Sequence, residues 1–228
     1  MLGIGLLGVS SAGAVLLTLT DVPPIHKAAW RLQATTLILL PFAMAERRRT
    51  EPEEHLLGGR LLPLIISGTF LAAHFGLWIA SLDMTSLTHS LLFVTSHPFL
   101  ILIGMLILRQ PAGSKAIAGV VAGGIGAVLT TGDLTSSGGA TLSGDLVALS
   151  GAAAIVGYLA AGRVLRGERQ MPLFLYAFPV TAIAGILLSL HAMATEGATF
   201  DLAIVDSSLF GWTSSKPTSS DIAWIFLV

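Results

Sequence analysis

Residues 61–82 read LLPLIISGTFLAAHFGLWIASL, an apolar run without a Lys, Arg, Asp or Glu. As an α-helix this run is about 33 Å long, at roughly 1.5 Å per residue, and the hydrocarbon core of a bilayer is about 30 Å thick. Arg60 precedes the run and Asp83 follows it, so charge resumes where the run ends. The sequence therefore predicts a transmembrane helix over Leu61–Leu82.

The composition of the whole chain also indicates a membrane protein. Of its 228 residues, 54% are hydrophobic and 11% are charged, and the mean hydropathy is +0.83. Soluble domains carry about 25% charged residues, a polar coat that lipid-facing helices do not need. The net charge of −1 gives no sign of nucleic-acid binding. The chain has no Cys, which excludes disulfides and thiolate chemistry.

Further apolar stretches are long enough, or nearly long enough, to span a bilayer. They are Leu2–Leu19, Ile25–Ala45, Ser86–Leu108, Ala116–Thr131, Leu146–Leu165 and Leu173–Ala194. Another begins at Asp221, and the sequence stops inside it at Val228. We therefore expect an all-α, polytopic membrane bundle that is truncated in helix 8.

Basic residues concentrate on one side of this predicted topology. Most of the 12 Lys and Arg residues fall in the loops after the second, fourth and sixth spans: Arg47, Arg48, Arg49, Arg60, Arg109, Lys115, Arg163, Arg166 and Arg169. The other side holds Lys27, Arg31 and Lys216. The positive-inside rule places the larger group in the cytoplasm if the host is the plasma membrane, or in the equivalent compartment if it is an organellar membrane. The N-terminus is then predicted to lie on that same side.

Small residues form two stripes that are typical of close helix packing in membranes. Gly119 and Gly123 make a G-x-x-x-G in the fifth predicted span, and Ala153, Gly157 and Ala161 repeat the spacing in the sixth. We expect both stripes to pack against other helices of the same chain. The alternative is a homodimer interface.

A weak internal repeat relates the two halves of the chain. The first and sixth predicted spans are both rich in small residues, and each is followed by a Pro-led helix, at Val22-Pro-Pro-Ile25 and at Met171-Pro-Leu-Phe174. The offset is roughly 140 residues, and an odd number of helices per repeat makes the second copy inverted, as in many secondary transporters.

The stretch Ala73–Phe99, AHFGLWIASLDMTSLTHSLLFVTSHPF, resembles the helix 3–4 region of EamA-type proteins of the drug/metabolite transporter superfamily. The segments Ala29-Trp-Arg-Leu32 and Gly144-Asp-Leu-Val-Ala-Leu149 and the Gly-rich fifth span fit the same resemblance. His97, directly before a proline, departs from the family pattern, in which a small or apolar residue is more usual.

The resemblance implies a ten-helix bundle of two inverted five-helix repeats. It assigns residues 1–131 to the first repeat, 132–144 to a linker and 145–228 to part of the second repeat. It further implies a secondary transporter or exporter that moves small metabolites, such as amino acids, sugars or nucleotide derivatives, by alternating access through a central cavity. Its partners would be that substrate and the lipid bilayer.

Two other classes of function compete with transport. A non-transporting membrane receptor or scaffold is the alternative, although the short loops leave no sizeable ligand-binding domain. An enzyme is not expected, because the chain shows no nucleophile–base pair, no metal-ligand cluster and no carboxylate in mid-membrane. Neither a cofactor nor a metal is predicted.

Polar side chains at bilayer depth are the candidate substrate ligands, because they are costly there and usually face the bundle interior or a cavity. His74 and Trp78 lie four residues apart and share one helix face. His89 and His97 share a face of the next span. The alternative is that these histidines bond to neighbouring helices.

Pro98 interrupts the fourth predicted span beside two hydroxyl side chains, Thr95 and Ser96. Proline has no N–H, so we expect a kink that frees the carbonyl of Val94 for a ligand. The alternative is that the hydroxyls bond back to their own helix.

Tyr158 and Arg31 complete the predicted site. Tyr158 comes from the matching face of the second repeat, and Arg31 is a candidate contact for an anion, or else an interface anchor that snorkels toward the headgroups. The predicted substrate-binding residues are His97, Thr95, Ser96, His74, Trp78, His89, Tyr158 and Arg31.

Overall fold

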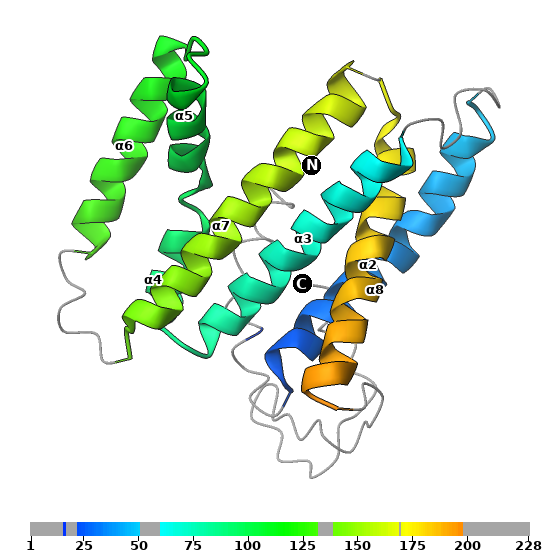
Figure 1. Cartoon of the computed structure of the whole chain (residues 1–228), viewed down its shortest axis with the longest axis horizontal. Helices are drawn as coiled ribbons and strands as arrows, with labels where there is room; N and C mark the ends of the chain where they lie inside the picture. The colour runs from blue at the N-terminus through cyan, green and yellow to red at the C-terminus, as the bar shows by residue number, and fades with distance from the viewer. Residues whose placement is uncertain (1–15, 17–21, 51–59, 132–138, 169, 198–228) are drawn as a thin grey trace.

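The structure, a computed structural model, describes residues 16, 22–50, 60–131, 139–168 and 170–197, and every regular element in them is helical. The helices are α2 (Pro24–Arg47), α3 (Leu61–Leu82), α4 (Leu87–Val94), α5 (His97–Ile107), α6 (Ser114–Thr131), α7 (Leu142–Gly162) and α8 (Leu173–Thr195), and a π-helical turn (Arg163–Glu168) continues α7 (Figure 1). Except for Leu16, the predicted spans at Leu2–Leu19 and after Asp221 lie outside the described residues.

Four segments of the described chain are long and apolar enough to cross a membrane. They are Leu61–Leu82, Leu87–Ile107, Leu142–Gly167 and Leu173–Thr195. The helix predicted over Leu61–Leu82 is confirmed at both ends. Large apolar side chains such as Leu37, Ile107 and Leu129 are exposed on the outside of the molecule, as a surface in contact with lipid requires.

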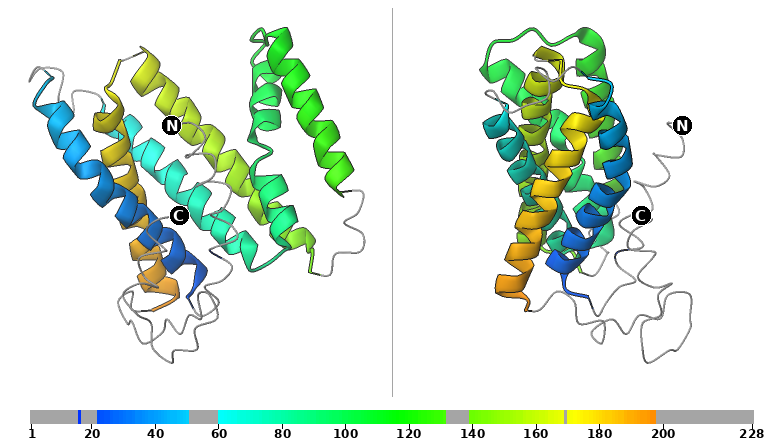
Figure 2. Two further views of the ribbon diagram at one scale, coloured as in Figure 1. Left: turned by 180° about the vertical axis from the view of Figure 1, so that it is seen from behind. Right: turned by 90° about the vertical axis from the view of Figure 1, so that its right-hand side faces the viewer.

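The helix α3 lies at the centre of the described bundle, between α7 on one side and α8 on the other (Figure 1). The helices α2 and α8 run antiparallel along each other, side by side in both views of Figure 2. The helix α4 packs against α7, and α5 also contacts α7. The helix α6 runs antiparallel beside α5, at the edge of the described bundle (Figures 1 and 2).

The fourth predicted span is two helices rather than one kinked helix. After α4 ends, Thr95 Oγ1 donates to the carbonyl of Leu91 at 2.6 Å, and Ser96 Oγ donates to that of Phe93 at 2.6 Å. Pro98 follows in the first turn of α5 and has no N–H with which to continue α4. The helix therefore stops after Val94 and restarts at His97. The hydroxyls of Thr95 and Ser96 bond back to α4, which is the alternative that the sequence analysis gave for them.

Glycines let α3 approach two neighbouring helices. A Cβ on Gly68 of α3 would lie 2.6 Å from Ile183 of α8, and one on Gly157 of α7 would lie 2.6 Å from the ring of Phe70 of α3. Real Cβ atoms do not come this close, so a larger residue at either crossing would force its neighbour to shift. The prediction of packing within the chain is confirmed for Gly157.

The other small-residue stripe does not pack in this way. No described residue of another helix has an atom within 4 Å of the place where a Cβ on Gly119 or Gly123 would stand. The expectation that these two glycines pack closely against another helix is therefore wrong for the described part of the chain. The reason is that α6 meets its neighbour α5 elsewhere, where the ring of Phe99 lies against Gly124.

The helices α2 and α8 both begin without a local cap. Each starts after a proline, Pro23 or Pro172, and neither residue supplies a capping side chain. The N–H groups of a first helical turn have no partner within their own helix. Away from water, each one left unsatisfied costs several kcal/mol, so the caps must come from elsewhere in the fold.

Each of these helices is capped by a carboxylate at the end of the other. The bonds join Glu196 to the N–H groups of Ile25 and His26, at 3.0 Å each, and Glu46 to those of Phe174 and Leu175, at 2.6 and 3.0 Å. The second and third positions of both helices are thus capped in the same way. We call this pair of contacts the reciprocal caps.

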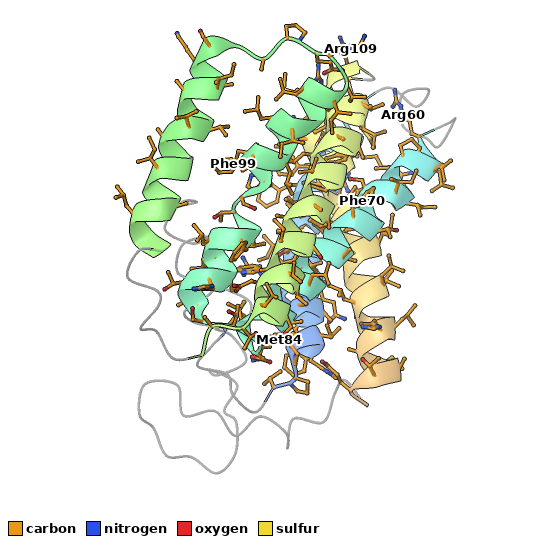
Figure 3. All side chains as sticks on the ribbon, turned by 60° about the vertical axis from the view of Figure 1, so that its left-hand side comes forward. Arg60, Phe70, Met84, Phe99 and Arg109 are labelled. Carbon is orange, nitrogen blue, oxygen red and sulfur yellow. The ribbon has the colours of Figure 1, made fainter. Side chains whose placement is uncertain are left out.

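The described basic loops lie at one end of the bundle. Figure 3 shows Arg60 and Arg109 at one end of the molecule and Met84 at the opposite end. Arg47 and Arg60 line one cleft of about 330 Å³. We call the end of the molecule that carries Arg60 and Arg109 the basic end. At the opposite end α7 begins at Leu142, inside the segment 132–144 that the sequence assigned to a linker.

Candidate functional site

Arg31, about two turns into α2, packs against aromatic rings of α3. Its Cζ atom lies 5.3 Å from the ring centre of Phe75 and 5.6 Å from that of Trp78, within the range of cation–π attraction. Its Nη1 atom is buried and has no hydrogen-bond partner among the described residues. The guanidinium of Arg31 therefore packs against α3 inside the described bundle.

His74 links α3 to α7 beside these rings. Its Nδ1 atom lies 2.9 Å from the carbonyl oxygen of Gly151, and because a carbonyl only accepts, Nδ1 carries the proton. The ring of His74 stacks on Trp78 with 6.3 Å between centres and meets Phe75 edge-on at 5.1 Å. The shared face that the sequence predicted for His74 and Trp78 is confirmed.

His97, the first residue of α5, comes from the break between α4 and α5. Both His97 and Arg31 lie near enough to His74 to interact with it electrostatically. Arg31 of α2 thus lies against His74, Phe75 and Trp78 of α3, and His97 of α5 interacts with His74 at longer range. We call these five residues the central cluster.

A comparison with protein families identifies the chain. The sequence profile of the EamA-like transporter family matches residues 2–132, which is more than half of the 228 residues. The chain belongs to the EamA-like transporter family. No curated protein matches it, and no solved structure matches it either.

Family membership and the apolar helices together give the general role. An EamA-like transporter with four segments suited to crossing a bilayer is an integral, multi-pass membrane protein that functions in transport. The matched range contains all five residues of the central cluster.

Two of the predicted site residues of this EamA-like chain directly precede His97 but line a second cleft. Thr95 and Ser96 border a cleft of about 750 Å³ between α4–α5 and α6. The other lining side chains are almost all apolar, including Phe93, Phe99 and Met105. Both hydroxyls already donate to backbone carbonyls, so they offer this cleft little hydrogen bonding.

His89 and Tyr158 lie toward opposite ends of the bundle. His89 Nδ1 is 2.9 Å from Asp145 Oδ2 at the start of α7, and Asp145 also accepts from Thr85 at 2.8 Å. Tyr158 packs 6.2 Å from Tyr176, ring centre to ring centre, toward the basic end. The contacts of these two residues thus lie outside the central cluster.

Several polar contacts of the EamA-like fold were not predicted from the sequence. Buried hydroxyl pairs join Ser67 to Tyr176 at 2.8 Å and Ser81 to Ser90 at 2.7 Å, and Gln33 donates to Ser189 at 2.6 Å. These partners come from different helices, so no spacing within one span reveals them. Within the described residues no three His, Asp or Glu side chains gather to hold a metal ion.

Proposed function

We propose that this protein moves a small metabolite across the membrane by alternating access, with the central cluster as its substrate-binding centre. The supporting observation is a charged and aromatic site inside an otherwise apolar bundle, in which Arg31 Nη1 and Trp78 Nε1 are buried without a partner among the described residues. Ionisable groups at membrane depth usually mark substrate pathways. Buried donors without acceptors are costly, so they favour a site that a ligand completes.

The remaining predicted residues border the same path. Thr95 and Ser96 form the break between α4 and α5, and discontinuous helices are typical of transporter binding sites. His89 lies nearer the end that carries Met84, and Tyr158 lies nearer the basic end. We place them along the route by which substrate reaches and leaves the cluster.

The ten-helix architecture of two inverted five-helix repeats is part of this proposal, with repeats at 1–131 and 145–228 and a linker between them. The reciprocal caps support it. An approximate two-fold axis that exchanges antiparallel α2 and α8 would also exchange Glu46 with Glu196, and the first turns that they cap. Inverted repeats predict such a pair of equivalent contacts.

Transport assays on His97 and His74 test the binding centre. We expect His97→Ala and His74→Ala each to lower the rate of substrate uptake into proteoliposomes about tenfold or more, because each removes a polar contact worth about 1.4 kcal/mol. Thr95→Val, which keeps the shape of an exposed side chain bonded to its own helix, should have a smaller effect. Uptake that both histidine variants leave unchanged, at normal protein level, would contradict this site.

Cysteine labelling tests the proposed orientation, with the basic end and the N-terminus in the cytoplasm. The chain has no Cys of its own, so single replacements report without background. In intact cells an impermeant maleimide should label Ala140→Cys but neither Ser114→Cys nor Gly167→Cys, three positions that are exposed. After lysis all three should react. Labelling of Ser114 and Gly167 from opposite sides would disprove the topology.

A further inference from the structure

The geometry points to a substrate that carries an oxyanion, a carboxylate or a phosphate, which Arg31 and the indole N–H of Trp78 bind together. This inference rests on the proposed transport function and names the class of its substrate. It comes from the pattern of donors and acceptors in the central cluster.

The aromatic rings hold the guanidinium of Arg31 but leave its hydrogen-bonding capacity unused. Cation–π contact with Phe75 and Trp78 acts on the charge, whereas the N–H bonds lie in the guanidinium plane and need acceptors. No described residue accepts a hydrogen bond from Nη1, which is buried. An arginine fork matches two oxygens of a carboxylate or phosphate.

No protein carboxylate in the described chain is available to Arg31. The acidic side chains that the structure describes are Glu46 and Glu196, which cap α8 and α2, Asp83, which pairs with Lys27 at 3.9 Å, and Asp145, which binds His89 and Thr85. Each is already engaged toward an end of the bundle. The ionisable group of the central cluster that interacts with Arg31 is His74, which is a base, and His74 interacts in turn with a second base, His97.

Trp78 supplies a second donor next to the first. Its side chain is 6% exposed, and its Nε1 is buried without a hydrogen-bond partner among the residues that the structure describes. Leaving a buried N–H unpaired costs about 1–3 kcal/mol. Since Arg31 lies over the ring of Trp78, both unpaired donors belong to one place. A group that only accepts hydrogen bonds and carries negative charge satisfies both, and ionised carboxylates and phosphates are such groups.

A binding assay on the purified protein in neutral detergent tests this class. The probes are matched pairs that differ in charge: succinate with succinamide, glycerol 3-phosphate with glycerol, and inorganic phosphate with chloride at equal ionic strength. We expect at least one oxyanion to raise the melting temperature while its matched control does not. The inference would be overturned if only the neutral compounds raised the melting temperature, or if none of the oxyanions did.

Variants connect that stabilisation to the two donors. Arg31→Gln should raise the half-saturating concentration of the stabilising anion about tenfold or more, which is about 1.4 kcal/mol of lost binding. Trp78→Phe keeps a ring but removes the N–H, and it should weaken binding less. Arg49→Gln, an exposed arginine beyond α2, should leave it unchanged. If Arg31→Gln is not monodisperse, Arg31→Lys, which keeps charge but loses the fork, gives the comparison.

Two further arms distinguish a soluble oxyanion from a lipid headgroup and from a neutral or cationic substrate. A shift with phosphatidylglycerol, and with none of the soluble anions, would assign the site to a lipid headgroup and overturn the substrate class. In proteoliposomes, uptake of only neutral or cationic compounds, unaffected by Arg31→Gln, would overturn the inference while transport stands. Uptake of no compound above protein-free liposomes, despite anion binding, would instead count against the proposed function.

Discussion

Replacing Gly144 by alanine is expected to destabilise the folded protein by about 3 kcal/mol or more. Gly144 lies in the first turn of α7, where a Cβ would stand 2.6 Å from Thr85 Cβ and 2.8 Å from the backbone carbon of Met84. Backbone cannot rotate away as a flexible side chain can, so α7 must move. That movement would break the bonds of Asp145 to Thr85 and His89.

Thermal unfolding in detergent measures the effect of this substitution. For a chain of this size the loss corresponds to a fall in melting temperature of roughly 6 °C or more. Gly119→Ala is the matched control, because no residue of another helix in the described part of the chain has an atom within 4 Å of its added Cβ. Alanine favours a helix over glycine by about 1 kcal/mol, so the control should melt no lower than the parent. Equal melting temperatures for both variants would contradict the close approach of α7 to Thr85 and Met84.

Removing either reciprocal cap should cost about 2–3 kcal/mol of folding free energy. Glu196→Ala removes two hydrogen bonds to the first turn of α2 and the 2.6 Å contact with His26. Glu46→Ala removes two bonds to the first turn of α8. We expect the Glu196 variant to be the less stable of the two, because it also leaves buried His26 without its partner.

Melting temperatures of the single and double variants test these caps. The two sites lie at opposite ends of a helix pair, well beyond about 10 Å apart, so their effects should add. Thr195→Ala is the control, an exposed neighbour of Glu196 whose hydroxyl bonds back to its own helix. If both glutamate variants have the same melting temperature as the parent, the carboxylates do not stabilise the first turns of α2 and α8.

Sequence patterns predicted those parts of the fold that depend on one helix at a time. The bounds of Leu61–Leu82 followed from an uncharged run between Arg60 and Asp83. Pro98 marked the place where the next span is interrupted, but not that it stops, because that depends on the bonds of Thr95 and Ser96 back to α4. The glycine spacing in α6 led to a wrong prediction of close packing, because spacing alone does not show which helix, if any, faces the glycines.

For the candidate site, too, the sequence predicted the features that belong to one helix and missed those that depend on how two helices pack. The common face of His74 and Trp78 follows from a spacing of four residues, whereas the contact of Arg31 with that face depends on how α2 crosses α3. The reciprocal caps were missed because Glu46 and Glu196 look like ordinary acids at helix ends, and their partners are 128 to 171 residues away. The signal present in the sequence was the pair of Pro-led helices, each without a capping side chain of its own.

The reciprocal caps also set an order for biosynthesis. Glu196 follows His26 by 170 residues. The N–H groups of the first turn of α2 therefore lack this carboxylate until the ribosome has synthesised the intervening residues. The nascent α2 therefore enters the bilayer with an unfinished end, which requires water, a lipid headgroup or the translocon to solvate it. The first turn of α2 receives its protein acceptor only when α8 is inserted beside it, so we expect the amino-terminal half made alone to be less stable than the same half paired with α8.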